Sequence, residues 1–127
     1  MKEHIRLPDT ELDVMNVLWA SAQPMTGTQV TQALAQAHGW AATTVLTLLQ
    51  RLEAKGFVQR QKQGRGYLYS AAVTQQEYLP QESRTILDRL FAGSARNLMA
   101  ALHSGDALSR KDIDELQQYL EELKKDM

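Results

Sequence analysis

Hydrophobic side chains recur at helical spacing through the first half of the chain and predict three helices. The apolar positions that follow Pro8 fit a first helix over residues 9–20. The Thr26-x-x-Gln29 pattern predicts a capped start for a short second helix, and Gly39 is placed to end it. A third helix is expected from about residue 42 to Gly56. Its core side should carry Val45, Leu48, Leu49 and Leu52.

The pattern then changes to one typical of β-strands. Residues 57–62 and 67–71 read as two strands, and Gln63, Gly64, Arg65 and Gly66 supply the turn of a hairpin. Three helices followed by a hairpin indicate a winged helix-turn-helix. In that fold the third helix lies in the major groove of DNA, and the hairpin, or wing, reaches phosphates or an adjacent minor groove.

The back half of the chain reads as helical throughout. Thr74 and Ser109 begin capping boxes, Ser94 can cap a short helix between them, and Pro80 predicts a kink or a restart near Leu79. The helices carry apolar seams with charged flanks. The seam residues are Ile86, Leu87, Leu90, Phe91, Leu98, Leu102, Ile113, Leu116, Leu120 and Leu123.

These seams set the expected domain organisation. Three short helices bury little apolar surface alone, so the seams either fold back on the front domain or, as we favour, pair with a second copy. We therefore expect a mainly α protein with a small β-hairpin wing. Its parts are a winged-helix DNA-binding domain over residues 1–73 and a three-helix homodimerisation region over 74–127.

Length and composition exclude several classes of protein. With 127 residues, 43% hydrophobic and 23% charged, the chain fits one small globular domain with an oligomerisation arm. No apolar run approaches the roughly 20 residues that span a bilayer. The first residues lack the features of a signal peptide, and there are no cysteines. We expect a cytoplasmic protein with no membrane association.

Charge is distributed unevenly along the chain. Residues 1–74 hold seven Lys/Arg against five Asp/Glu, a net +2, and the remainder holds seven against ten, a net −3. Five basic residues lie within 51–65, which is typical of a surface that binds nucleic acid. No formal charge occurs between Asp13 and Arg51, so a third helix that reads DNA must use uncharged side chains. The expected DNA-binding residues are Thr43, Thr44, Leu46, Thr47, Gln50 and Arg51 on the helix and Arg60, Lys62, Arg65 and Tyr67 on the hairpin.

Several segments resemble one known family. LPDTELDVMNVLW at 7–19, TTVLTLLQRLEAKG at 43–56, GRGYLY at 64–69 and LDRLFAGS at 87–94 are similar to the penicillinase-repressor family of the BlaI, MecI and CopY type. The resemblance implies a homodimeric transcriptional repressor bound to a palindromic DNA operator. It implies that the base-reading helix begins near Ala42 and includes Thr47, and that the wing contains Gly64, Arg65 and Tyr67.

The chain departs from the family at positions that matter for function. Many members have Lys or Arg where Leu46 stands and Ser where Ala41 stands, so their operator sequence does not transfer. Copper-responsive members end in a Cys-x-Cys pair that is missing here. Members that respond to β-lactams are cleaved at an Asn–Phe bond, where this chain reads Ala101-Leu102. The sequence therefore leaves open whether a membrane protease sensor, or another protease that relieves repression, is a partner.

Other classes of function have weaker support. His103, Ser104 and Asp106 are adjacent at an expected helix end rather than in a catalytic triad, so no enzyme is expected. His4 and His38 are far from His103, no His-x-x-x-His pair occurs, and no metal or other cofactor is expected. The alternative function is a winged-helix adaptor that binds protein and does not bind DNA specifically.

Overall fold

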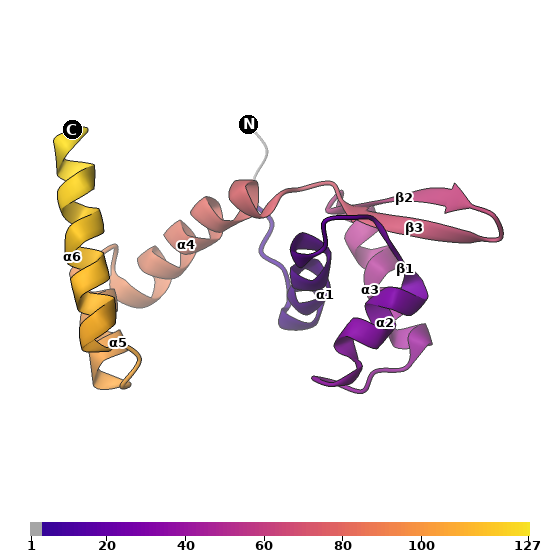
Figure 1. Ribbon diagram of the computed structural model, residues 1–127, viewed down its shortest axis with the longest axis horizontal. Helices are drawn as coiled ribbons and strands as arrows, with labels where there is room; N and C mark the ends of the chain where they lie inside the picture. Colours follow the sequence, from indigo (N-terminus) through magenta and orange to yellow (C-terminus); the bar gives the residue numbers. More distant parts are fainter. Residues whose placement is uncertain (1–3) are drawn as a thin grey trace. The chain divides into compact units, whose positions relative to one another are not determined.

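The computed structural model describes residues 4–127 and contains nine elements (Figure 1). In chain order they are α1 (Asp9–Ala20), β1 (Met25–Thr26), α2 (Gly27–Ala35), α3 (Ala42–Ala54), β2 (Val58–Gln63), β3 (Gly66–Ala71), α4 (Gln75–Phe91), α5 (Ala95–Ser104) and α6 (Arg110–Lys125). The three predicted front helices and the hairpin are confirmed, as is the helical back half. None of the helices within residues 4–127 combines the length and the apolar character needed to cross a bilayer.

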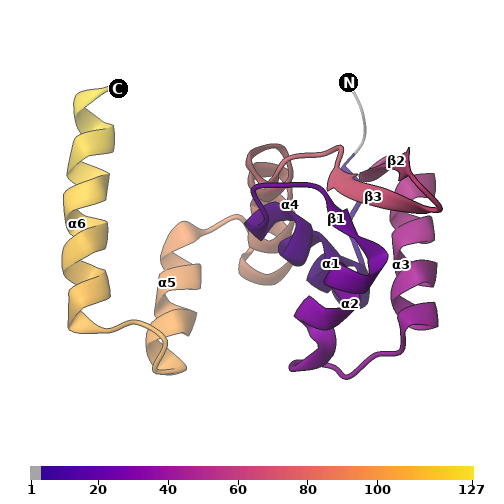
Figure 2. The same cartoon turned by 45° about the vertical axis from the view of Figure 1, so that its right-hand side comes forward.

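The chain divides into two compact units, Met1–Glu82 and Ser83–Met127. The division falls inside α4, nine residues beyond the expected boundary at residue 73, because Tyr78 and Glu82 of α4 are buried in the first unit. In that unit α1, α2 and α3 surround a common core, and the sheet lies along one side of the helices (Figure 2).

The core of the first unit is formed by one side of each front helix and by the base of the hairpin. The expected core side of α3 is confirmed, since Val45, Leu48, Leu49 and Leu52 are each at most 5% exposed. The other buried hydrophobic residues are Leu7, Val14, Met15, Leu18, Val30, Leu34, Phe57, Val58, Tyr69 and Tyr78. Each fully buried aliphatic side chain of this size stabilises the fold by roughly 1.5–3 kcal/mol.

The sheet has three antiparallel strands in the order β1-β3-β2. Strands β2 and β3 pair from Val58–Ala71 to Gln63–Gly66, so Gly64 and Arg65 alone form the turn. Gly64 has φ of +60°, a conformation that suits the first position of a two-residue hairpin turn and that glycine adopts without strain. The short strand β1 was not expected from the sequence. It pairs with the middle of β3 and so connects the start of α2 to the hairpin.

Side-chain caps begin several helices where the sequence predicts them. In the box before α2, the Thr26 N–H donates to Gln29 Oε1 over 2.8 Å and the Gln29 N–H donates to Thr26 Oγ1 over 3.1 Å. The Thr74–Glu77 and Ser109–Asp112 boxes have the same reciprocal bonds. Each such cap stabilises its helix by about 1 kcal/mol.

An ion pair between a buried glutamate and a partly exposed lysine connects α1 to the end of α3. Glu11 is 3% exposed and accepts a hydrogen bond from Nζ of Lys55. Lys55 is the residue directly after α3. A carboxylate inside a protein is costly unless it is paired, so loss of the Lys55 ammonium would leave Glu11 buried without its partner. The pair therefore holds the C-terminal end of α3 against α1.

A second buried carboxylate joins the N-terminal segment to the first turns of α4. Glu82 is 9% exposed and accepts a hydrogen bond from the Tyr78 hydroxyl, and its two oxygens lie 3.2 Å from Arg6 Nε and 3.5 Å from His4 Nε2. The Tyr78 oxygen in turn accepts the Leu7 N–H over 3.2 Å. Burial, and then the hydrogen bond to Glu82, raise the pKa of Tyr78 to about 12.

The second unit, Ser83–Met127, has no buried side chain. Helices α5 and α6 contain no buried residue, although both carry hydrophobic side chains at helical spacing. α4 is a single helix that passes through Pro80 without ending, so of the two alternatives expected near Leu79, a kink or a restart, the restart is wrong. The carbonyl that Pro80 leaves without a backbone partner belongs to Gln76, which is exposed and accessible to water.

The raised pKa of Tyr78 predicts a specific loss of stability at high pH. Between pH 10 and about 12 the folded protein keeps a proton that the unfolded chain releases, so the free energy of unfolding falls as pH rises through this range. We expect Tyr78→Phe to be less stable than the parent at pH 7 by about 1–2 kcal/mol, because Glu82 loses a donor. Its stability should decline less steeply above pH 10. Urea unfolding from pH 7 to 11 measures both effects.

Tyr119→Phe is the matched control, because Tyr119 is 56% exposed on α6. This variant should follow the parent at every pH. Equal slopes for the parent and Tyr78→Phe above pH 10 would show that Tyr78 titrates alike in the folded and unfolded states.

Candidate nucleic-acid interface

The outer side of α3 presents the six helix residues expected to contact DNA. All six are exposed, because the inward side of the helix is taken up by the core. They are Thr43, Thr44, Leu46, Thr47, Gln50 and Arg51. Leu46 is 44% exposed, which is unusual for a leucine on a helix whose other leucines are almost fully buried. The Thr47 hydroxyl donates to the Thr43 carbonyl oxygen over 3.0 Å.

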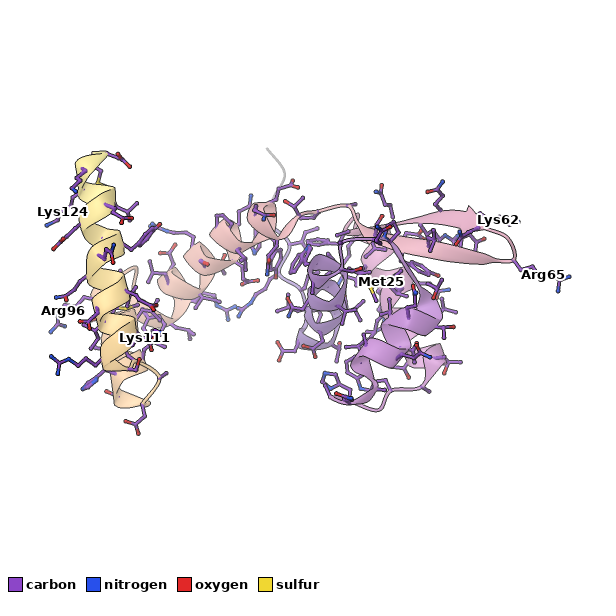
Figure 3. The ribbon with its side chains drawn as sticks, viewed as in Figure 1. Met25, Lys62, Arg65, Arg96, Lys111 and Lys124 are labelled. Carbon is purple, nitrogen blue, oxygen red and sulfur yellow. The ribbon has the colours of Figure 1, made fainter. Side chains whose placement is uncertain are left out.

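The tip of the hairpin presents two cationic side chains. Lys62 is exposed near the end of β2, and Arg65 is exposed in the two-residue turn, from which its side chain extends away from the strands (Figure 3). Within residues 4–127 neither side chain lies within ion-pair distance of a carboxylate. Both are therefore available to an anionic ligand.

Arg60 is held differently from the two cations at the tip. Its Nε lies 3.0 Å from Glu53 Oε2, and its guanidinium lies over the Tyr67 ring at 4.3 Å from the ring centre. These contacts join α3, β2 and β3, since Glu53 is on α3, Arg60 is on β2 and Tyr67 is on β3. Arg60 thus has a structural role that its sequence position did not reveal. No sequence pattern relates Glu53 to Arg60, because the two side chains meet only when the folded chain brings β2 beside α3.

The basic cluster of residues 51–65 is consequently smaller on the surface than in the sequence. Lys55 is paired with the buried Glu11, and Arg60 is paired with Glu53. Arg51, Lys62 and Arg65 have no carboxylate partner among residues 4–127. Two of the three lie at the hairpin tip, and the third lies at the edge of the exposed side of α3.

The two tryptophans serve in packing. Trp19 Nε1 donates to the Val73 carbonyl oxygen over 2.9 Å, and Trp40 stacks on the His38 ring with 4.0 Å between ring centres. His38 Nε2 also lies 2.9 Å from Asp13 Oδ2, so the loop before α3 is attached to α1. Neither aromatic ring belongs to the exposed side of α3.

Three of the predicted seam residues, Ile113, Leu116 and Leu120, line an open apolar groove in the second unit. A groove of about 440 Å³ lies between α5 and α6, and its apolar lining includes Met99, Leu108, Ile113, Leu116 and Leu120. Ile113 is 40% exposed and Leu120 is 54% exposed, while Leu90 of α4 is 70% exposed. A large part of each of these side chains is therefore left exposed by the second unit.

The Ala101–Leu102 bond lies inside α5. The Ala101 carbonyl accepts the Gly105 N–H over 3.0 Å, and the Leu102 carbonyl accepts the Ala107 N–H over 2.8 Å. A protease needs an extended backbone, so α5 would have to unwind before cleavage at this bond. Nothing in the local geometry marks this bond for cleavage.

Three helices packed around a core and followed by a two-stranded wing define a winged helix-turn-helix protein. Comparison with known proteins identifies the family. The model of the penicillinase repressor family matches residues 7–122, and the chain belongs to this family. The resemblance noted in the sequence is thereby confirmed.

Individual relatives support the assignment along nearly the whole chain. The penicillinase repressor of Bacillus licheniformis is 32% identical over 124 residues, which cover 98% of this chain and 96% of the relative. The methicillin resistance regulatory protein MecI of Staphylococcus aureus is 24% identical over 114 residues, covering 90% and 92% of the two chains.

Two solved structures share the fold of the first unit. The solution structure of the DNA-binding domain of the repressor BlaI matches 61% of this chain and 94% of its own, with a TM-score of 0.53 and 31% identity. A second solution structure holds the monomeric form of BlaI from Bacillus licheniformis in complex with the blaP half-operator. Its TM-score is 0.51, with 31% identity over 61% of this chain and 94% of that one.

Proposed function

We propose that this protein is a DNA-binding transcriptional repressor that acts as a homodimer on a palindromic operator. The observation that carries the proposal is the exposed side of α3 beside a hairpin whose tip cations, Lys62 and Arg65, are unpaired in the described chain. The relation to a BlaI structure in complex with a half-operator supports it. A repressor of this kind blocks transcription by occupying the DNA that RNA polymerase requires.

The two parts of the interface have different tasks. The exposed side of α3 enters the major groove, where side chains meet base edges and set sequence preference. Lys62 and Arg65 contact phosphates, or the adjacent minor groove, and contribute affinity for any sequence. Arg60 positions the wing relative to α3 through Glu53 and Tyr67.

A second copy of the chain supplies what one copy lacks. The second unit has no buried side chain, and the α5–α6 groove is almost wholly apolar, so pairing two such units removes exposed hydrophobic surface from water. The candidate interface of one copy holds only three cations without a carboxylate partner among residues 4–127, which are Arg51, Lys62 and Arg65, so one copy alone would bind DNA weakly at physiological salt. Two copies held together engage two half-sites and multiply their affinities.

Selection from a pool of random-sequence DNA duplexes tests the proposed function. The purified protein should enrich inverted repeats whose half-site centres are about 10–10.5 base pairs apart, or a small multiple of that spacing. Binding of the enriched duplexes should weaken steeply with salt concentration. Enrichment of single half-sites without inverted repeats would contradict the dimeric arrangement. No enrichment above random DNA would favour the protein-binding adaptor, which the uncharged and partly apolar side of α3 would suit.

Two single substitutions separate the task of Arg65, which contacts DNA, from that of Arg60, which positions the wing through Glu53. Arg65→Ala should weaken binding to every sequence and flatten the slope of log K against log salt by about 0.9 for each bound subunit.

Glu53→Gln should weaken operator binding by about threefold per subunit, because Arg60 no longer has a partner on α3. Its salt slope should stay close to that of the parent. Fluorescence anisotropy at several salt concentrations measures both quantities.

The sign of the Glu53→Gln effect is decisive. Loss of a negative charge near DNA by itself predicts tighter binding, so tighter binding would contradict the positioning role that we assign to the Arg60–Glu53 pair. Asp114→Asn is the matched control for net charge, because Asp114 is exposed on α6 in the second unit.

A double substitution in the apolar groove tests the dimer. Leu116→Asp with Leu120→Asp adds two negative charges to the groove and should give monomers in sedimentation velocity, since charges cannot be buried without partners. Gln118→Asp with Lys125→Gln changes the net charge equally on the opposite side of α6 and should leave the dimer intact. A dimer that persists in the first variant would place the subunit contact elsewhere.

A further inference from the structure

Four side chains form one uncharged stripe along the exposed side of α3. Thr43, Leu46, Thr47 and Gln50 follow the spacing i, i+3, i+4 and i+7, which places them on one face of a helix. All four are exposed, and Leu46 is 44% exposed at the middle of the stripe. Arg51, the only Lys or Arg in α3, falls on the flank of this stripe.

The stripe offers mostly methyl groups to a ligand. Thr47 uses its hydroxyl hydrogen in the 3.0 Å bond to the Thr43 carbonyl, which leaves its methyl group and the acceptor side of its oxygen. Leu46 contributes two methyl groups, and Thr43 contributes one. Gln50 is the only residue of the stripe whose side chain can donate and accept side by side.

These groups match one pair of bases in the major groove. Thymine is the only base that carries a methyl group there, and apolar side chains recognise it by contact. A glutamine amide pairs with adenine through N6 and N7, whereas guanine is typically read by Arg or Lys in a bidentate contact. The stripe contains neither Arg nor Lys, and no formal charge occurs between Asp13 and Arg51.

We infer that this protein selects A·T pairs within each half-site, and that Leu46 contacts the methyl group of a thymine. The inference rests on the proposed function, since it requires that α3 lies in the major groove. It assigns Leu46, with the methyl groups of Thr43 and Thr47, as specificity determinants. Gln50 reads the adenine of the same or an adjacent pair. Arg51 is left for a phosphate or a flanking base.

Replacement of thymine by deoxyuridine tests the inference directly, because it removes the 5-methyl group and keeps base pairing. The probe is an inverted-repeat duplex enriched by the full-length protein from a random pool, resynthesised with deoxyuridine at one thymine position at a time. At the position that meets Leu46, we expect a loss of about fourfold in affinity per methyl group, the factor expected when one methyl-sized group is no longer buried. Replacement in both half-sites together should cost about fifteenfold.

Leu46→Ala identifies the side chain responsible. In this variant the thymine and deoxyuridine duplexes should bind within about twofold of each other, since the contact is already lost. Leu79→Ala is the matched control, because Leu79 is 45% exposed on α4, and it should keep the full fifteenfold ratio. The ratio of the two affinities is the readout, so a general change in affinity does not affect the result.

The outcomes separate the inference from the proposed function. Specific binding of an inverted repeat that is insensitive to deoxyuridine at every position would overturn methyl recognition and leave the repressor intact. A fifteenfold ratio that survives Leu46→Ala would overturn the assignment to Leu46. Failure to enrich any duplex would contradict the proposed function itself.

Discussion

The burial of one side of α3 determines what the first unit can present to a ligand. Leu49 and Leu52 have no exposed surface, and Val45 and Leu48 have very little, so the helix cannot rotate about its axis without exposing them. Rotation by one residue, about 100°, would cost several kcal/mol of hydrophobic burial. The outward positions are therefore fixed by the inward ones. The ion pair between Glu11 and Lys55 then fixes the C-terminal end of the same helix.

Much of this unit was predictable because its signals are local. The Thr26–Gln29 capping box and the period of the apolar residues in α3 depend on neighbours within one or two turns, and the structure contains them where expected. The strand β1 was not predictable, since two residues carry no alternating pattern and pair only because β3 lies beside them. The position of the division within α4 also depends on distant partners, Leu7 and Arg6, which meet Tyr78 and Glu82.

The candidate interface, too, was predictable from the sequence only where its signals are local. The exposed residues of α3 follow from the helical period alone, and the structure places all of them outside the core. Not every basic residue of the 51–65 cluster contributes a free cation to the surface, because Lys55 and Arg60 have carboxylate partners that lie on other elements. A count of charges in a sequence window cannot distinguish a cation that binds a ligand from one that fixes a strand to a helix.

The placement of uncharged side chains on α3 and of free cations on the hairpin has an evolutionary consequence. If base preference depends on Thr43, Leu46, Thr47 and Gln50, then a single codon change on α3 can redirect the protein to a new DNA sequence. The attraction to DNA in general would persist through such a change, because Lys62 and Arg65 belong to a different element. Duplicated copies of such a gene could then acquire separate targets in small steps, while each intermediate continues to find and occupy DNA.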